Sequence, residues 1–246
     1  MSKTTFLSLI GGQLRPKEGV IKINGVDIYD LSDTQRRDLI GLQVQTATNL
    51  RGELRYNLLF GLPGNEEMDS FLEADPEALD YEQVLELIAE HRAKSVKEQI
   101  YTDEELIEIL QKDGLWEIFV AKEGLETLIS EGGLNLSGGQ RQRLNFAGLH
   151  LWAKYFKPSV ILIDEPTSSL DEVFEHAVTK MILELAKDSL TFVIAHRLKT
   201  LDKASGILDF SLNTDEKQMK FYTQKELANR SDYYQKLIKG EVELDG

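Results

Sequence analysis

Two uninterrupted apolar stretches stand out in the second half of the chain. Residues 159–163 and 190–195 are continuous runs of the kind found in fully buried strands of a parallel sheet. Between them, apolar residues recur at a spacing of four and predict a helix from about residue 173 to residue 187. A strand, a helix and a second strand in this order predict a parallel sheet covered by helices. The apolar residues of the helix are Val173, Ala177, Met181 and Leu185.

The first part of the chain predicts shorter elements. Residues 20–28 alternate in polarity around Asn24-Gly25, which predicts two short strands joined by a turn. Ser32 followed by Gln35 forms a capping box, in which each side chain satisfies a free N–H at a helix start. We expect the helix that it opens to end near residue 39. The apolar residues 39–44 then predict a further strand.

The middle of the chain, residues 62–113, differs from both flanks. It holds 16 acidic and 4 basic side chains, so nearly all of the net charge of −14 lies there. Its apolar stripes predict helices, and Thr102 with Glu105 forms a second capping box. The segment is interpreted either as a solvated helical face or as a lobe that docks a partner. The apolar stripes are Val84, Leu85, Leu87 and Ile88, and then Leu106, Ile107, Ile109 and Leu110.

Composition excludes several classes of protein. The 246 residues suit one large domain, or one core with an added lobe. A net charge of −14 disfavours generic binding to nucleic-acid backbones, and the absence of cysteine excludes disulfides and thiolate metal sites. No apolar run approaches the length needed to span a bilayer, and the N-terminus does not resemble a signal peptide. We therefore expect a soluble, cytosolic chain.

The sharpest local motif is residues 137–140, Ser-Gly-Gly-Gln. The two glycines let the backbone approach a ligand closely, and the helix-compatible residues 144–151 follow. N–H groups at a helix start, together with the helix dipole, favour an anion there. Alone, the motif could be only a loop and a helix cap. Arg141 and Arg143 directly after it favour a phosphate-binding role.

Polar side chains follow three of the predicted strands. Asp164 ends an apolar strand and is placed to hold Mg²⁺, because Mg²⁺ prefers oxygen ligands. Glu165, next to it, is the candidate to orient or deprotonate an attacking water. His196 follows residues 191–195 and could hydrogen-bond a terminal phosphate. Gln45 follows the strand at 39–44 and could contact Mg²⁺ or water.

The N-terminus contains a fragment of a fifth motif. A phosphate-binding loop needs glycine-rich backbone and then Gly-Lys-Ser/Thr at the start of a helix. Lys3 would reach the outer phosphates and Thr4 would bind Mg²⁺ through its hydroxyl. Ser2 stands where the last glycine belongs. An ordinary helix start explains this fragment equally well when it is taken alone.

These five features, in this order, resemble the nucleotide-binding domain of an ATP-binding cassette (ABC) transporter, over residues 2 to about 237. The signature motif, residues 136–140, is the most specific of them. Residues 127–133 are similar to an exporter-type X-loop, and residues 52–58 resemble the exporter stretch after the Q-loop. The other matches are residues 3–4 with the Walker A loop, Gln45 with the Q-loop, residues 161–165 with Walker B, residues 169–171 with the D-loop and His196 with the switch histidine.

The resemblance implies a site shared between two copies of the domain. Two domains would sandwich two ATP molecules head to tail, with Glu165, His196 and Gln45 catalytic. Thr4, Gln45 and Asp164 would hold Mg²⁺. The residues expected to contact ATP are Ser2, Lys3, Thr4, Thr5 and Asp171, together with Ser137, Gly138, Gly139 and Gln140.

The resemblance also implies an architecture. We expect an α/β, P-loop NTPase-like fold with a mostly parallel sheet, helices on both faces and an all-helical signature subdomain. Residues 1–57 and 152–246 would form the RecA-like core, and residues 58–151 the helical subdomain with its acidic insertion. The strands that usually precede Walker A do not occur, so the N-terminal β-subdomain would be largely missing. We expect Met1 to be an internal methionine of a longer transporter, or the gene to be truncated.

The expected function is ATP hydrolysis that drives transport, most consistent with an exporter. The expected partners are a second ABC ATPase domain, identical or different, and a transmembrane domain on the same or another chain. The chain would then lie on the cytoplasmic side of a membrane, and no nucleic acid is expected. Two alternatives stay open: a truncated remnant or regulatory partner with little activity, and an ABC ATPase that does not transport.

Overall fold

The protein is described here from a computed structural model. The structure describes residues 3–43, 49–62, 100–164, 172–195, 202–212 and 219–239, without the side chains of residues 43 and 172–174. The predicted segment with Val84 and its neighbours therefore lies outside the described residues, as do Ser2, Gln45, Glu165, Asp171 and His196.

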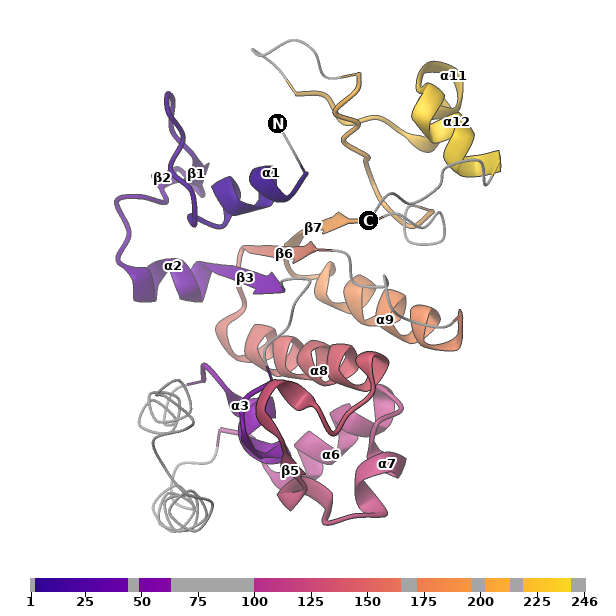
Figure 1. Cartoon of the computed structure of the whole chain (residues 1–246). Helices are drawn as coiled ribbons and strands as arrows, with labels where there is room; N and C mark the ends of the chain where they lie inside the picture. Colours follow the sequence, from indigo (N-terminus) through magenta and orange to yellow (C-terminus); the bar gives the residue numbers. More distant parts are fainter. Residues whose placement is uncertain are drawn as a thin grey trace.

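A three-stranded parallel sheet lies at the centre of the fold (Figure 1). Its strands are β3 (Ile40–Gln43), β6 (Val160–Asp164) and β7 (Leu190–Ile194), in the order β3-β6-β7. Ile40 pairs with Val160, which in turn pairs with Leu190, so the three strands begin at one level. Helix α9 (Glu172–Leu185) connects β6 to β7, as the pattern of apolar positions predicts. The buried stripe of α9 also includes Val178 and Ile182, whereas Ala177 is only half-buried.

The two faces of β6 pack against different layers. Ile161 and Ile163 join a hydrophobic cluster with α8 (Gly138–Phe156) and α9. Val160 and Leu162 point the other way, into a cluster with Leu7 of α1 (Lys3–Ile10). Successive side chains of a strand alternate between faces, so one apolar run fills both layers. The result is the α/β architecture with helices on both faces that the sequence predicts.

A short hairpin and a capped helix lie between α1 and β3. Strands β1 (Lys22–Ile23) and β2 (Val26–Asp27) pair in an antiparallel manner, as predicted. The turn between them places both Asn24 and Gly25 at positive φ, a conformation that these two residue types tolerate best. Helix α2 (Asp33–Leu39) begins at the predicted capping box of Ser32 and Gln35 and ends at Leu39.

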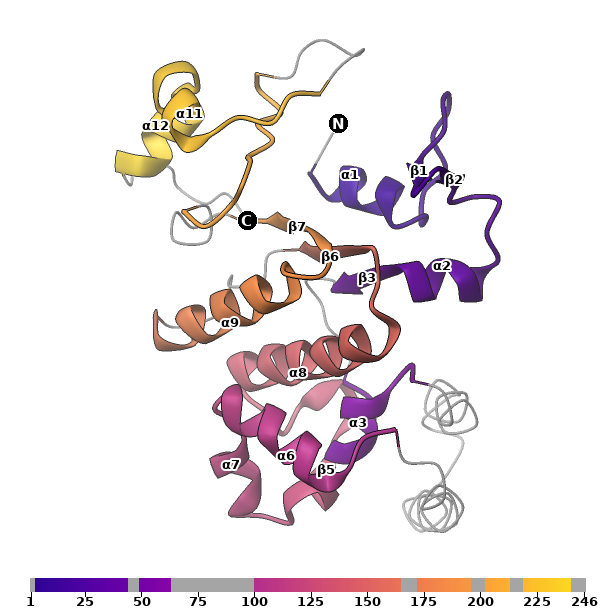
Figure 2. The same cartoon turned by 180° about the vertical axis from the view of Figure 1, so that it is seen from behind.

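A lobe built mainly of helices packs on the far side of α8 (Figure 2). Helix α6 starts at the predicted capping box of Thr102 and Glu105. A two-residue antiparallel pair, β4 with β5, joins the two ends of the lobe, so the lobe is not wholly helical. The elements are β4 (Gly52–Glu53), α3 (Leu54–Leu59), α6 (Asp103–Lys112), α7 (Trp116–Val120), β5 (Leu128–Ile129) and the 3₁₀ turns η2 (Gly124–Glu126) and η3 (Glu131–Gly133).

Polar contacts join the lobe to α8, and others join elements within the lobe. The Tyr101 hydroxyl donates to the Leu151 carbonyl of α8 (2.8 Å). The Arg55 guanidinium of α3 forms a two-bond ion pair with Asp103 at the start of α6. Since β4 and α3 pack with the lobe, the described lobe begins a few residues before the predicted boundary at residue 58. The division into two domains itself stays a prediction.

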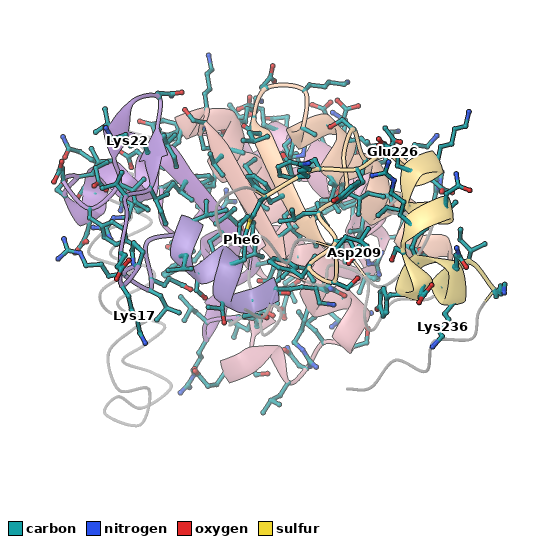
Figure 3. The ribbon with its side chains drawn as sticks, turned by 90° about the horizontal axis from the view of Figure 1, so that it is seen from above. Phe6, Lys17, Lys22, Asp209, Glu226 and Lys236 are labelled. Atoms are coloured by element: carbon teal, nitrogen blue, oxygen red, sulfur yellow. The ribbon has the colours of Figure 1, made fainter. Side chains whose placement is uncertain are left out.

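The C-terminal part lies beyond β7, on the α1 side of the sheet. It contains α11 (Gln224–Arg230) and α12 (Asp232–Lys239), which Figure 3 shows beside the segment that carries Asp209. The Ser231 hydroxyl between the two helices donates to the Asp209 carboxylate. The Phe6 ring of α1 meets Phe192 of β7 and Phe210 edge-on, with ring centres 6.0 and 5.7 Å apart, respectively. Aromatic edges therefore join α1, β7 and the C-terminal part.

Candidate functional site

The carboxyl ends of the three parallel strands meet at one edge of the sheet, and α1 begins at the same edge (Figure 1). Helix α1 then runs back along β6 and β7, held by buried Leu7. Ligands of open α/β sheets bind outside the carboxyl ends of the strands, and a helix N-terminus there favours an anion. This edge is therefore the candidate site for a phosphate group.

Asp164 is the last residue of β6 and lies half-buried at this edge. It is in register with Ile194, the last residue of β7. Glu165 follows Asp164 directly, and His196 follows Ile194 by two residues; both lie outside the described residues. Because β6 and β7 end in register, the strands that lead to Glu165 and His196 end at neighbouring positions of this edge.

Lys3 and Thr4 occupy the first turn of α1, where Thr4 is exposed and Lys3 half-buried. Thr5 lies in the same turn and is also half-buried. The N–H groups of a first helical turn have no acceptor within the helix, so they can bind an anion. The fold thus brings Lys3 and Thr4 to the edge that carries Asp164, as the sequence predicts.

Ser137 is the cap of helix α8, on the other side of the sheet from α1. Its hydroxyl accepts a hydrogen bond from the Gln140 backbone N–H (3.2 Å), while the Gln140 side chain accepts one from the Ser137 N–H (2.9 Å). The predicted helix start is confirmed. The fold places this motif and the Lys3–Thr4 pair on helices that cover opposite faces of the sheet.

Gly138 has room for a larger side chain within its own chain. A Cβ built on it would meet only the Arg141 guanidinium, at 3.9 Å, which is ordinary van der Waals contact. By contrast, Gly133, with φ +63°, is closely surrounded. The packing of the described residues therefore does not require glycine at position 138.

The two arginines after the motif donate hydrogen bonds to backbone carbonyls of their own chain, a role that the sequence interpretation did not include. The Arg141 guanidinium donates to the carbonyls of Gly133 (3.2 Å) and Leu136 (2.9 Å), so it braces the loop before the helix. Arg143 is only 2% exposed and donates to the carbonyls of Gly139, Asp113 and Gly114. Both side chains donate these hydrogen bonds to backbone oxygens. The spacing of residues along the sequence does not reveal such contacts.

Two asparagines fix residues 49 and 50, which precede β4, and sequence analysis did not single them out. The Asn57 amide brackets Leu50, accepting from its N–H (2.9 Å) and donating to its carbonyl (3.0 Å). Asn49 is 1% exposed and donates to the Asn145 side chain of α8 (3.0 Å). Asparagine near a turn is usually explained by local backbone bonding, so the long-range pair carries no signal in the sequence.

The lobe also buries titratable groups that the sequence does not reveal. Burial raises the pKa of the Asp113 carboxyl to about 7, against the opposing attraction of Arg143 and Lys112. Burial has the opposite effect on a histidine, because it disfavours the charged form, and it lowers the pKa of His150 on α8. The nearby ammonium groups of Lys112 and Lys154 lower this pKa further. These shifts belong to the lobe and to the helix α8 on which it packs, and not to the edge with Asp164.

Within the described ranges, no group of three or more His, Asp or Glu side chains is arranged to hold a metal ion. Nor does any described helix combine the length and apolar character needed to cross a membrane.

The chain is similar to many known proteins. The sequence model of the ABC transporter family matches residues 2–168. An uncharacterized ABC transporter ATP-binding protein, YwjA of Bacillus subtilis, is 32% identical over 88% of the chain and 31% of its own length. The beta-(1→2)glucan export ATP-binding/permease protein NdvA of Rhodopseudomonas palustris is 33% identical over 85% of the chain and 28% of its own length.

The fold also matches a solved structure, that of a bacterial Atm1-family ABC exporter with ATP bound. The TM-score is 0.70 at 22% identity, and the match covers 98% of this chain and 35% of the other. The chain spans about a third or less of the length of these relatives. Because the family model matches more than half of its residues, the protein belongs to the ABC transporter family, as an ATP-binding domain homologous to those of exporter-type transporters.

Proposed function

We propose that the protein binds ATP with Mg²⁺ and hydrolyses it to drive export across a membrane. Membership of the family implies ATP binding and, in general, ATPase activity. The observation that carries the finer proposal is the shared edge at which α1 begins and β3, β6 and β7 end. Lys3, Thr4 and Asp164 lie at this edge. The strands β3, β6 and β7 also end there, one or two residues before Gln45, Glu165 and His196, respectively.

The residues at the edge suit the chemistry of Mg²⁺. The Asp164 carboxylate and the Thr4 hydroxyl offer the oxygen donors that Mg²⁺ prefers, and the Gln45 side chain adds a third. Bound Mg²⁺ supplies positive charge that neutralises phosphate oxygens. Lys3 and the N–H groups of the first turn of α1 would hold the outer phosphates, and we assign Ser2 and Thr5 to the same nucleotide.

Hydrolysis is assigned to the residues after the strands. We assign to Glu165 the orientation of the attacking water and the acceptance of its proton, because Glu165 follows Asp164 directly in the sequence. His196, past the end of β7, hydrogen-bonds the terminal phosphate. The preorganised donors stabilise the charge that develops on the phosphate oxygens during transfer.

The signature residues 137–140 are assigned to the ATP of a second domain. They lie at the start of α8, across the sheet from α1. The signature residues and the α1 residues of one chain therefore do not face the same nucleotide. The open space at Gly138 supports an approach from outside the chain, because nothing within the described chain needs a glycine there. Asp171 joins the same interface. The second domain is a copy of this one or a different ABC domain.

Coupling to transport requires a membrane partner. NdvA and the putative multidrug export protein YgaD of Bacillus subtilis are ATP-binding/permease proteins by name, and this chain covers less than a third of either. We assign a transmembrane domain as the partner, on the same or another chain, which places the ATPase on the cytoplasmic side of the membrane. Closure of two domains on ATP moves that partner, and hydrolysis resets it.

Substitution of Glu165 tests the assignment. Glu165→Gln is expected to abolish steady-state release of phosphate while ATP still drives two domains together, because only the proton acceptor is lost. Phosphate release and light scattering with Mg-ATP measure the two effects. Glu123→Gln, an exposed glutamate of the lobe, is the control and should leave both unchanged. Turnover that survives Glu165→Gln would contradict the proposal.

A further inference from the structure

One buried side chain fastens the start of helix α8 to the end of helix α6. The Arg143 guanidinium is 2% exposed and donates to the carbonyls of Asp113 (3.1 Å) and Gly114 (2.9 Å), at the end of α6. Its Nε–H also donates to the Gly139 carbonyl (3.3 Å), in the first turn of α8. Arg143 therefore joins the turn that carries the signature glycines to the neighbouring helix of the lobe.

A carboxyl group is buried beside this guanidinium, at the unfavourable end of its helix. Asp113 is 3% exposed and caps the C-terminus of α6. The helix dipole is negative at that end, so it opposes a carboxylate and favours a cation such as Arg143. The buried Oδ2 atom of Asp113 accepts no hydrogen bond from any described residue, although an ionised carboxylate can accept several. The structure is therefore that of a neutral Asp113 carboxyl group.

Ionisation of Asp113 would create a buried negative charge that needs a partner. The charged groups that act on its carboxyl are Arg143 of α8 and Lys112 of α6. The Lys112 ammonium is exposed and forms an ion pair with Glu108, whereas Arg143 is buried together with Asp113. Because a buried charge is costly unless it is paired and hydrogen-bonded, the carboxylate would recruit an N–H of the guanidinium. The longest of the three bonds that Arg143 donates to carbonyls, to Gly139, is the easiest to give up.

We propose that Asp113 is a positioning residue whose protonation state controls how Arg143 holds the signature turn, residues 137–140. With the carboxyl group neutral, Arg143 bridges Gly139 and the end of α6. When the carboxyl group releases its proton to solvent, the guanidinium turns toward it and the signature turn loses this link to the lobe. The inference rests on the proposed function, in which residues 137–140 contact the nucleotide of a second domain. ATP turnover should therefore fall as pH rises through the pKa of Asp113, which burial raises to about 7.

Carbon and nitrogen NMR of the isotope-labelled, nucleotide-free protein tests the contact directly. The Asp113 carboxyl carbon should titrate with a midpoint near pH 7, and the Arg143 Nε–H and Gly139 amide signals should shift with the same midpoint. In Asp113→Asn, which keeps the shape of the side chain and stays neutral, these two signals should stay fixed from pH 6.5 to pH 8.5. His150 does not titrate in this range, because its pKa is lowered from 6.5. Fixed signals in the wild type, or equal shifts in Asp113→Asn, would overturn the inference.

The pH profile of ATP turnover gives the functional readout. The turnover of Asp113→Asn divided by that of the wild type, at saturating Mg-ATP, should be near one at pH 6 and rise to roughly three at pH 8.5, since only the wild type ionises there. Glu117→Gln, at an exposed carboxyl of the neighbouring helix α7, is the matched control and should keep this ratio near one throughout. A merely structural role of Asp113 predicts that Asp113→Asn changes turnover by the same factor at every pH.

The two readouts distinguish failure of this inference from failure of the proposed function. If the NMR signals titrate together but the turnover ratio does not change with pH, Asp113 does not position the signature turn for the reaction, and the ATPase proposal stands. Fixed NMR signals in a wild type that turns over ATP lead to the same conclusion. If neither the wild type nor Glu117→Gln turns over ATP at any pH, the ATPase proposal fails, and the inference falls with it.

Discussion

The two faces of the central sheet are covered to very different depths. Among the described residues, the cluster on the α8 side contains 26 buried apolar residues and runs without a break into the lobe, whereas the α1 side contains seven. The signature motif therefore stands on a thick core, while Lys3 and Thr4 stand on a thin one.

The largest expected effect comes from two neighbours on β6 that point to opposite faces. Ile161 and Leu162 are both fully buried, but Ile161 lies in the thick cluster and Leu162 in the thin one. Ile161→Ala is expected to lower the free energy of unfolding by roughly 4–5 kcal/mol, and Leu162→Ala by roughly 2–3 kcal/mol, because a thin layer collapses more readily into the space left behind. Urea unfolding of both variants measures the difference.

The two substitutions serve as controls for each other, since they share a strand and a loss of apolar volume. Equal losses would mean that the seven-residue layer is as rigid as the thick one. A larger loss for Leu162→Ala would reverse the comparison between the two faces.

The second effect concerns pH and belongs to the lobe side alone. The Asp113 carboxyl titrates near 3.8 when unfolded, and burial raises its pKa to about 7 in the folded protein. Between these pH values the folded state binds more protons, so its stability falls as pH rises and stays constant above about 7. The loss is at most about 4 kcal/mol. Asp113→Asn should remove it, as unfolding by urea from pH 5 to pH 8 would reveal.

His150 contributes the opposite trend. Its pKa is lowered by burial, so the stability it provides is present above its unfolded pKa of 6.5 and is lost as pH falls through the lowered value. The difference between the wild type and Asp113→Asn isolates the carboxyl from this background. Asp188→Asn, at an exposed aspartate, should leave the profile unchanged. A profile for Asp113→Asn that matches the wild type would show that Asp113 stays ionised.

A pair of glycines gives the third and smaller effect. Gly41 of β3 lies under Trp152 of α8, and a Cβ there would come within 2.6 Å of the indole ring. Gly41→Ala should therefore cost about 1–3 kcal/mol, since the thick face has no spare volume. On the thin face, a Cβ at Gly11 would meet the Leu7 carbonyl oxygen at 3.2 Å and Leu162 Cδ1 at 3.3 Å. Gly11→Ala should change stability by less than about 1 kcal/mol, because the smaller unfolded-state entropy of alanine offsets the tight contact.

Thermal unfolding of the two glycine variants checks this prediction. Comparable losses would show that α1 is packed on the sheet as closely as α8 is. A loss for Gly11→Ala alone would contradict the comparison outright.

Local patterns predicted most of the described elements. Apolar runs located β6 and β7, the Asn24-Gly25 turn located the hairpin, and the capping boxes located the starts of α2 and α6 to the residue. Each depends on neighbours within four positions along the chain. The contacts of Arg141 and Arg143 depend on carbonyls up to 30 residues away, so the sequence does not reveal them.

The candidate site was only partly predictable for the same reason. Asp164 lies at the carboxyl end of a parallel strand, where the rule for such sheets places ligand-binding residues, and α1 begins with Lys3 and Thr4 at the same edge. The roles of Gln45, Glu165, His196 and Asp171 stay predictions, since these residues lie outside the described ones. The Asn49–Asn145 pair and the buried Asp113 depend on packing between the lobe and α8, which no periodicity along the chain encodes.

The smallest expected effect separates structure from function within one motif. Ser32 and Ser137 cap α2 and α8 with the same reciprocal bonds to a glutamine three residues on. Replacing either serine by alanine should cost about 1 kcal/mol of stability, because one N–H at the helix start loses its acceptor. Only Ser137→Ala should also lower ATP turnover, since Ser137 is assigned to the nucleotide of the second domain. Thermal unfolding and phosphate release measured on both variants test this. Turnover lowered equally by both would show that the effect of Ser137 arises from lost helix stability, and the assignment of the signature residues to a shared nucleotide would fail.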